Sequence, residues 1–293
     1  MTEDRTDARA AGAAARNSFV LIVLDSCRYD TFVEAAPVEM SKLGPVEKRY
    51  SYSSWTAPSH YNLLMGLMPH TNPRREFASN YYRRDFFKYT DRLGGDGLSF
   101  GSLVPGLYLP PFLHDRLGYS TTALVSLPVL NSFTPLNRGF DRFVLMKKHN
   151  DMAAMLDLMH FPPGRPSFYM LNVGETHYPY ALPTEQENLW PRLSGVHGVF
   201  KHLDDHVVDG SLVEGAADEF FDDATMQRLR ARQVEAVRYL DGVFGRLRRM
   251  LPPGTWVTIT SDHGELFGED GFFGHGPICH EKVFEVPFVE GRV

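Results

Sequence analysis

The sequence predicts an α/β fold with a mainly parallel central sheet and helices on both faces. Two observations predict it. Apolar runs of the kind that form buried strands end in polar residues. Helical patterns lie between these runs, and such alternation is typical of a parallel sheet covered on both sides. In sheets of this kind, binding and catalytic residues gather at the carboxyl ends of the strands.

Four segments have the pattern of buried strands. The first, SFVLIVLDS, is continuously apolar and delivers Asp25 to one edge of the sheet. The last, TWVTITSDHG, ends in the same way at Asp262 and His263. The segments are residues 18–26, 121–127, 167–173 and 255–264. We therefore expect Asp25, the loop after Val173 and the pair Asp262 and His263 to share one sheet edge.

Three segments have helical patterns. Residues 149–160 predict a short helix, and residues 222–251 predict a long amphipathic one that Asp222 or Asp223 caps and Pro252 ends. Residues 53–66 contain Thr56 before Pro58, which is typical of a helix start. The exposed amides of such a start favour an anion. A plain helix cap is the alternative.

The remaining segments are predicted to be irregular. Residues 81–111 are rich in glycine, proline and aromatic residues, and we expect an irregular excursion near the site rather than a second domain. Residues 204–223 are acidic and predict a solvated loop. Residues 1–17 are polar and alanine-rich without a hydrophobic signal core, so they predict a disordered or loosely helical tail. Residues 18–293 are expected to form a single domain.

Composition narrows the class of protein. The 293 residues are 43% hydrophobic, enough for a sizeable core, and the net charge of −6 gives no general attraction to nucleic acid or an anionic membrane. The longest apolar run is too short to cross a bilayer. Two cysteines, Cys27 and Cys279, make no disulfide framework and suit a reducing compartment. We expect a cytoplasmic protein without a nucleic-acid or membrane partner, and nothing indicates its oligomeric state.

Polar residues suited to metal and phosphoryl chemistry follow the predicted strands or begin a helix. Two carboxylates, imidazoles and a hydroxyl suit a divalent cation. A bound cation lowers the pKa of a coordinated hydroxyl and polarises a phosphoryl or sulfuryl oxygen. Each residue alone has an ordinary structural explanation, such as a cap or a turn. The residues are Asp25, Thr56, His177, Asp262, His263 and His275.

Together and in this order, the segments resemble the alkaline phosphatase superfamily, in particular its sulfatase-like branch. Four motifs carry the resemblance: VLDSCRYD at residues 23–30, TAPSH at 56–60, THYPY at 176–180, and TSDHGELFGEDGFFGHG at 260–276, followed by VFEVPFV. The resemblance covers residues 19–289 and implies the fold of that branch. Typical sulfatases continue into a smaller C-terminal subdomain, which we expect here to be reduced or absent.

The resemblance also implies roles for individual residues. Asp25, Asp262 and His263 bind a metal ion, and Thr56 bridges metal and substrate as the nucleophile. His177 and His275 contact the transferred group or protonate the leaving oxygen. Arg28, Ser59 and His60 are implied to support substrate binding, and His60 stands where sulfatases have an arginine.

Thr56 separates this chain from the sulfatases. Those enzymes oxidise a cysteine or serine at this position to formylglycine, whereas oxidation of a threonine would give a ketone. In this superfamily, threonine is the nucleophile of phosphodiesterases and of phosphoethanolamine or glycerol-phosphate transferases. We therefore expect a hydrolase or transferase of phosphate mono- or diesters that works through a phospho-threonine. A sulfatase without formylglycine, a non-catalytic binder of phosphorylated or sulfated ligands, and a structural protein remain alternatives.

Ser26 marks a second departure, because many sulfatases have another aspartate ligand there. No clear second set of ligands for a two-metal site is visible, so we expect one divalent ion. The oxygen-rich ligands favour Mn, Mg or Ca, and the histidine ligand keeps Zn as an alternative. A cluster of His197, His202 and His206 is the alternative, although a loop is expected there. The expected substrate is a small-molecule phosphate or sulfate ester.

Overall fold

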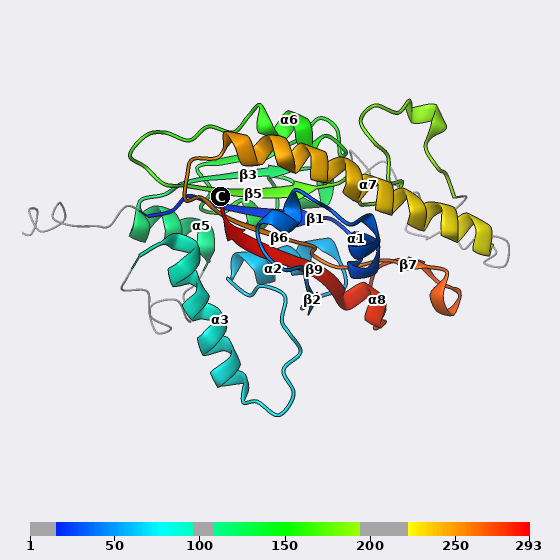
Figure 1. The fold of residues 1–293 in the computed structure, drawn as a ribbon, viewed down its shortest axis with the longest axis horizontal. Helices are drawn as coiled ribbons and strands as arrows, with labels where there is room; N and C mark the ends of the chain where they lie inside the picture. The colour runs from blue at the N-terminus through cyan, green and yellow to red at the C-terminus, as the bar shows by residue number, and fades with distance from the viewer. Residues whose placement is uncertain (1–15, 96–107, 194–221) are drawn as a thin grey trace, which may run out of the picture.

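The structure is a computed structural model and describes residues 16–95, 108–193 and 222–293 (Figure 1). Its centre is a seven-stranded sheet with the order β2-β9-β6-β1-β5-β3-β4. Strand β9 pairs antiparallel with β2 and β6, and the other pairings are parallel. The strands are β1 (Phe19–Leu24), β2 (Glu47–Tyr50), β3 (Ser120–Val125), β4 (Arg142–Leu145), β5 (Ser167–Val173), β6 (Trp256–Thr260) and β9 (Glu285–Arg292). The predicted mainly parallel sheet is confirmed.

Helices and short turns connect the strands, and a two-stranded hairpin follows β6. The helices are α1 (Tyr29–Ala35), α2 (Thr56–Leu64), α3 (Ala78–Leu93), α5 (Leu109–Pro111), α6 (Met152–Leu156), α7 (Asp223–Met250) and α8 (Glu281–Phe284). The short turns are 3₁₀ helices, namely η1 (Met40–Lys42), η3 (Pro128–Leu130), η4 (Pro135–Asn137), η5 (Glu187–Leu189) and η8 (Glu269–Gly271), and one π-helix, η2 (Phe112–Arg116). The hairpin strands are β7 (Leu266–Phe267) and β8 (Phe273–Gly274).

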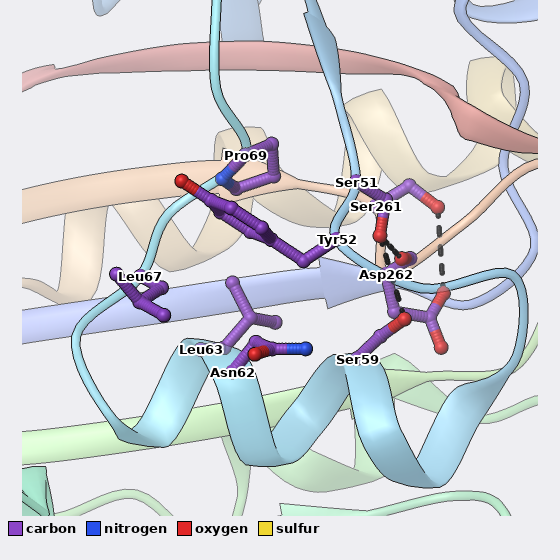
Figure 2. A pocket seen from close by; sticks show the side chains of 9 residues that line it. All are labelled: Ser51, Tyr52, Ser59, Asn62, Leu63, Leu67, Pro69, Ser261 and Asp262. Carbon is purple, nitrogen blue, oxygen red and sulfur yellow. Dashed lines mark hydrogen bonds between the residues drawn. The ribbon is translucent and has the colours of Figure 1, made fainter. Parts of the chain in front are cut away.

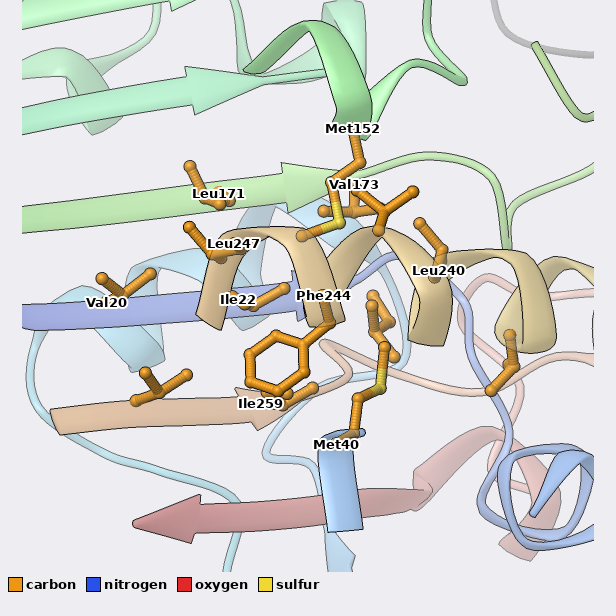
Figure 3. Close-up of a cluster of buried hydrophobic side chains, with 14 of the residues drawn as sticks. Val20, Ile22, Met40, Met152, Leu171, Val173, Leu240, Phe244, Leu247 and Ile259 are labelled. Carbon is orange, nitrogen blue, oxygen red and sulfur yellow. The ribbon is translucent and has the colours of Figure 1, made fainter. Parts of the chain in front are cut away.

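The central strand β1 is buried on both faces. Alternate side chains of a strand point to opposite faces. Ile22 and its alternate neighbours join the cluster that contains Phe244 and Leu247 of α7 (Figure 3). Leu21 joins the cluster on the other face, with Leu63 of α2. Burying each such side chain contributes roughly 1.5–3 kcal/mol, which explains why the strand reads as a continuous apolar run.

Helix α7 runs over one face of the sheet, as its amphipathic pattern predicted (Figure 1). Asp222 is the capping residue, and its carboxylate accepts a hydrogen bond from the backbone N–H of Thr225 at 2.8 Å. Leu240 and Phe244 are fully buried against the sheet. The helix ends before Pro252, which cannot continue it.

The prediction of an irregular excursion over residues 81–111 is wrong for its first part. Residues 78–93 form α3, a helix of 16 residues. Tyr81, Asp85, Tyr89 and Arg92 recur at helical spacing and form its buried face. Tyr81 and Tyr89, two of the aromatic residues that suggested irregularity, are therefore core contacts of a helix.

Several predictions concern residues outside the described ranges. They are most of the tail predicted at residues 1–17, residues 96–107 of the predicted excursion, most of the acidic loop predicted at 204–223, and the cluster of His197, His202 and His206. Within the described ranges, no helix is both long enough and apolar enough to cross a membrane.

Candidate active site

The candidate active site lies at the carboxyl ends of β1, β5 and β6, which are neighbours in the sheet. Asp25 follows β1 directly, and Asp262 and His263 follow β6. The backbone N–H of Asp25 donates to the carbonyl oxygen of Val173, the last residue of β5, at 2.9 Å. One edge of the sheet therefore brings together the three places that the sequence indicated.

Two carboxylates and one imidazole form a cluster suited to a metal ion. Asp25, Asp262 and His263 each offer one ligand atom, these atoms lie within 4.8 Å of one another, and all three residues are buried. Oδ1 of Asp262 accepts hydrogen bonds from the backbone N–H groups of Ser26 at 3.1 Å and His263 at 3.0 Å. Its Oδ2 is buried without a hydrogen-bond partner. An unpartnered carboxylate oxygen beside a second carboxylate is unfavourable without a cation, so these residues fit a divalent ion.

Burial sets the protonation of this cluster. Burial, and then the negative charge of Asp25, raise the pKa of Asp262 well above its usual range. Burial lowers the pKa of His263, and the neighbouring His275 lowers it further. The His263 ring is therefore neutral near pH 7 and has the lone pair that a metal ion requires.

The ring of His263 is oriented by the backbone. Its Nδ1 lies 2.9 Å from the carbonyl oxygen of Gly264, so Nδ1 carries the proton and donates. The lone pair is then on Nε2, which lies 3.3 Å from Oγ1 of Thr56 and 3.4 Å from Oδ2 of Asp262. Nε2 of His263 is thus near both the threonine hydroxyl and the carboxylate oxygen that has no hydrogen-bond partner.

Thr56 is the first residue of α2, as the Thr-x-Pro pattern predicted. Trp55 before it is extended, and its carbonyl oxygen accepts the backbone N–H of Ser59 at 3.3 Å. The apolar face of the helix, with Leu63 and Leu64, is buried against the sheet. This packing fixes a helix N-terminus, where backbone amides favour an anion, beside the two carboxylates.

Ser59 and His60 lie in the first turns of α2. The Ser59 hydroxyl donates to the carbonyl oxygen of Ser53 at 3.3 Å. Nδ1 of His60 donates to the carbonyl oxygen of Thr56 at 2.8 Å, and burial lowers the pKa of the ring. A neutral His60 supports the helix start, whereas the sulfatase arginine at this position would bring a positive charge.

A small pocket lies on the α2 side of Asp262 (Figure 2). Figure 2 shows serine side chains gathered at one end of it and Tyr52 with apolar residues at the other. The Ser51 hydroxyl donates to the carbonyl oxygen of Asp262. The space accommodates about one water molecule, which makes this pocket too small for a substrate.

His177 and His275 come from different loops and lie close to each other. Their ring centroids are 5.4 Å apart, and that of His275 is 4.2 Å from that of His263. Nδ1 of His177 donates to the carbonyl oxygen of Tyr178 at 2.8 Å. Burial alone would lower the pKa of His275, but hydrogen bonding to Glu265 raises it. The two histidines therefore lie next to the metal-binding cluster, as the motif order implied.

Arg28 is buried, and its guanidinium is occupied by protein groups. It pairs with Asp30 at 2.6 Å and with Glu269, and it donates to the carbonyl oxygen of Glu265 at 3.3 Å. These contacts connect the start of α1 to the hairpin that precedes His275. Substrate binding by Arg28 stays a prediction, and the contacts that the structure gives it are structural.

Two buried residues that the sequence analysis did not select join the loops of the site. The Asn172 amide donates to Oδ2 of Asp25 at 2.7 Å and lies 3.3 Å from Nε2 of His60. The Gln233 amide donates to the carbonyl oxygens of Ser26 at 3.0 Å and Thr176 at 2.9 Å. Their signal in the sequence is a polar residue inside an apolar strand or on the apolar face of a helix.

The comparisons with known proteins concern the fold. No protein-family model matches the sequence, and no curated protein matches it. The structure is similar to the C-terminal periplasmic domain of EcEptC from Escherichia coli, with 14% identity, a TM-score of 0.55, and coverage of 96% of this chain and 73% of that one. The same domain is also matched in a complex with Zn, with 13% identity, a TM-score of 0.54, and coverage of 95% and 73%.

Two further solved structures share the architecture. One is the phosphonate monoester hydrolase SpPMH from Silicibacter pomeroyi, with 17% identity, a TM-score of 0.55, and coverage of 94% of this chain and 67% of that one. The other is a 2-O GAG sulfatase, with 15% identity, a TM-score of 0.53, and coverage of 94% and 64%. The chain therefore has the fold of the alkaline phosphatase superfamily, in the sulfatase-like form that its sequence motifs predicted.

Proposed function

We propose that this protein is a metal-dependent hydrolase or transferase of phosphate mono- or diesters that works through a covalent phospho-threonine. The observation that carries the proposal is the position of Nε2 of His263, which lies 3.3 Å from the Thr56 hydroxyl at a helix start and 3.4 Å from Oδ2 of Asp262, an oxygen without a hydrogen-bond partner. Similar structures include a phosphonate monoester hydrolase and phosphoethanolamine transferases, whose names agree with ester chemistry at phosphorus.

Asp25, Thr56, Asp262 and His263 are the residues that would hold the metal ion. Such an ion lowers the pKa of a hydroxyl and polarises a phosphoryl oxygen. Carboxylate and hydroxyl ligands suit Mn, Mg or Ca, and the neutral imidazole also suits Zn. The similar EcEptC domain has been solved in complex with Zn.

The chain's own residues supply the remaining chemistry. Thr56 Oγ1, after losing its proton to solvent, attacks phosphorus as the bond to the leaving oxygen breaks. The departing oxygen takes a proton from the imidazolium of His177 or His275, so it leaves as an alcohol. The amides at the start of α2 face the negative charge of the phosphoryl oxygens.

Resolution of the phospho-threonine returns the chain to its starting state. A water or acceptor alcohol gives its proton to the same histidine and attacks phosphorus, and Thr56 leaves as the alkoxide. The Thr56 oxygen then regains a proton from solvent. Water as the attacking group makes the protein a hydrolase, and an acceptor alcohol makes it a transferase. We propose a small-molecule ester as the substrate. We also propose the cytoplasm as the location, because both described cysteines are free and free thiols suit a reducing compartment.

A turnover panel tests the proposal. It compares p-nitrophenyl phosphate, bis-p-nitrophenyl phosphate and p-nitrophenyl sulfate, with Mn, Mg, Ca or Zn restored after chelation. Thr56→Ala should lower phosphate ester turnover at least about 1,000-fold, because no other group forms the covalent intermediate. Thr56→Ser should retain part of the turnover, and Thr71→Ala, at an exposed threonine, should retain all of it.

The outcomes separate the alternatives. Full activity of Thr56→Ala would show that the nucleophile is a different residue. Turnover of the sulfate ester alone would establish the sulfatase alternative. A thermal shift on metal addition that survives in Thr56→Ala would show that the substitution left the fold and most of the metal site intact.

A further inference from the structure

His275 lies in a backbone segment that does little to orient it. It follows the hairpin of β7 and β8 and has glycines on both sides, Gly274 at φ 87° and Gly276 at φ 143°. Both conformations favour glycine. Since local propensity does not fix such a segment, the position of the His275 ring depends on what its side chain contacts.

Glu265 is the carboxylate that contacts this ring. Its Oε1 lies 3.4 Å from Nδ1 of His275, and the residue is 1% exposed. The Ser26 hydroxyl is the second group near that nitrogen, at 3.5 Å. Since a carboxylate accepts and does not donate, the arrangement selects the ring form in which Nδ1 carries hydrogen. The other ring nitrogen, Nε2, is then left for the reacting group.

Glu265 is itself held by a side chain from another loop. The Tyr180 hydroxyl donates to Oε2 of Glu265, and Tyr180 is fully buried. Tyr180 belongs to the loop after β5 that carries His177, and its ring packs against Phe267 with centroids 5.6 Å apart. One carboxylate thus links the His177 loop to the His275 ring.

We propose that Glu265, held by Tyr180, is a positioning residue for His275: it accepts the Nδ1 hydrogen and turns Nε2 toward the leaving oxygen. The proposal rests on the proposed function only for the role of the leaving oxygen. Loss of an acceptor that orients a functional imidazole typically costs about 10–100-fold. A purely structural Glu265 would instead connect the hairpin to the β5 loop without acting through the histidine.

A double-mutant cycle distinguishes these readings. The variants are Glu265→Gln, His275→Gln and the double variant, with Glu281→Gln as the matched control at an exposed glutamate. Glu265→Gln should lower kcat about 10–100-fold and leave KM within about twofold. In the His275→Gln background the same change should alter kcat less than about twofold, because the residue through which it acts is gone.

Leaving-group dependence gives a second readout. Both single variants should lose more activity on phenyl phosphate than on p-nitrophenyl phosphate, since the better leaving group needs less help from a proton donor. Equal losses on the two esters, or a full further loss in the double variant, would overturn the role of Glu265 while leaving the phospho-threonine chemistry intact. Normal turnover of His275→Gln would also overturn it.

A readout without turnover keeps the proposal testable on its own. Nitrogen NMR of the imidazole side chains in the metal-free protein reports which ring nitrogen carries hydrogen. The His275 signal, assigned by its absence in His275→Gln, should indicate hydrogen on Nδ1 and should shift in Glu265→Gln and Tyr180→Phe. It should not shift in Glu281→Gln. An unchanged signal in Glu265→Gln would contradict the proposal whatever the enzyme assays give.

Discussion

Two regions of this molecule bury charge in opposite ways. Beneath α3, the fully buried Arg92 donates to Glu290 of β9 at 2.9 and 3.3 Å. Burial pushes the pKa of Glu290 up, but Arg92 overcomes this and holds it below its usual range. At the carboxyl ends of β1 and β6, Asp25 and Asp262 are buried together, and Oδ2 of Asp262 has no hydrogen-bond partner.

The two regions differ in whether the chain itself supplies the opposite charge. Under α3 the chain supplies both the anion and the cation, so Arg92 and Glu290 offset each other's charge, while Nη1 of Arg92 is left without a hydrogen-bond partner. In the aspartate cluster the described residues supply two carboxyl groups and a neutral imidazole, and burial together with Asp25 opposes the ionisation of Asp262. We infer that the missing positive charge comes from outside the chain, and this is the physical basis for expecting a metal ion there.

The largest loss of folding stability is expected when the buried pair of Arg92 and Glu290 is broken. Glu290→Gln leaves Arg92 buried without its anion and should destabilise the fold by about 3–5 kcal/mol. Urea unfolding monitored by circular dichroism measures this. Glu235→Gln is the control, because Glu235 pairs with Arg238 on the exposed surface of α7 and its loss should cost less than about 1 kcal/mol. Equal losses for the two variants would contradict the comparison.

The fold was predictable because its strongest signals are local. A strand buried on both faces must be apolar throughout, so β1 is recognisable from residues 19–24 alone. Helix α7 combines an apolar face with the cap at Asp222 and the stop at Pro252. Helix α3 was missed because glycine and proline in the following residues obscured the helical spacing of its aromatic residues, and packing, rather than local propensity, decides that segment.

The site residues that directly follow strands could be predicted from the sequence. Asp25, Asp262 and His263 follow apolar runs, and parallel strands place such positions at one edge. Asn172 and Glu265 were not found, because their importance depends on which loops come together in three dimensions. A buried polar residue inside a strand pattern is the signal that would have selected Asn172.

Another buried carboxylate, Glu175, tests an intermediate case. Glu175 is fully buried, and burial raises its pKa from 4.5 to about 7. Below pH 4.5 both the folded and unfolded states are protonated, so Glu175→Gln should leave stability unchanged. As the pH rises to 7 the unfolded state releases the proton first, and the wild type loses up to about 3 kcal/mol that the variant keeps. Unfolding curves at pH 4.5, 6 and 8 measure the difference, and a constant difference would contradict the burial argument.

The smallest and most diagnostic change in folding stability is expected at Asp262. Its sign should be opposite to that of the change at Glu290. Because burial and Asp25 raise the pKa of Asp262, its contribution to stability is present at low pH and is lost as the pH rises. In chelator at pH 8, Asp262→Asn should therefore stabilise the fold by about 1 kcal/mol or more, whereas the same kind of change at Glu290 destabilises it. Added metal should raise the melting temperature of the wild type and not that of the variant. Destabilisation of the metal-free protein by Asp262→Asn would mean that the chain itself satisfies this carboxylate, and the case for a metal ion at the site would then fail.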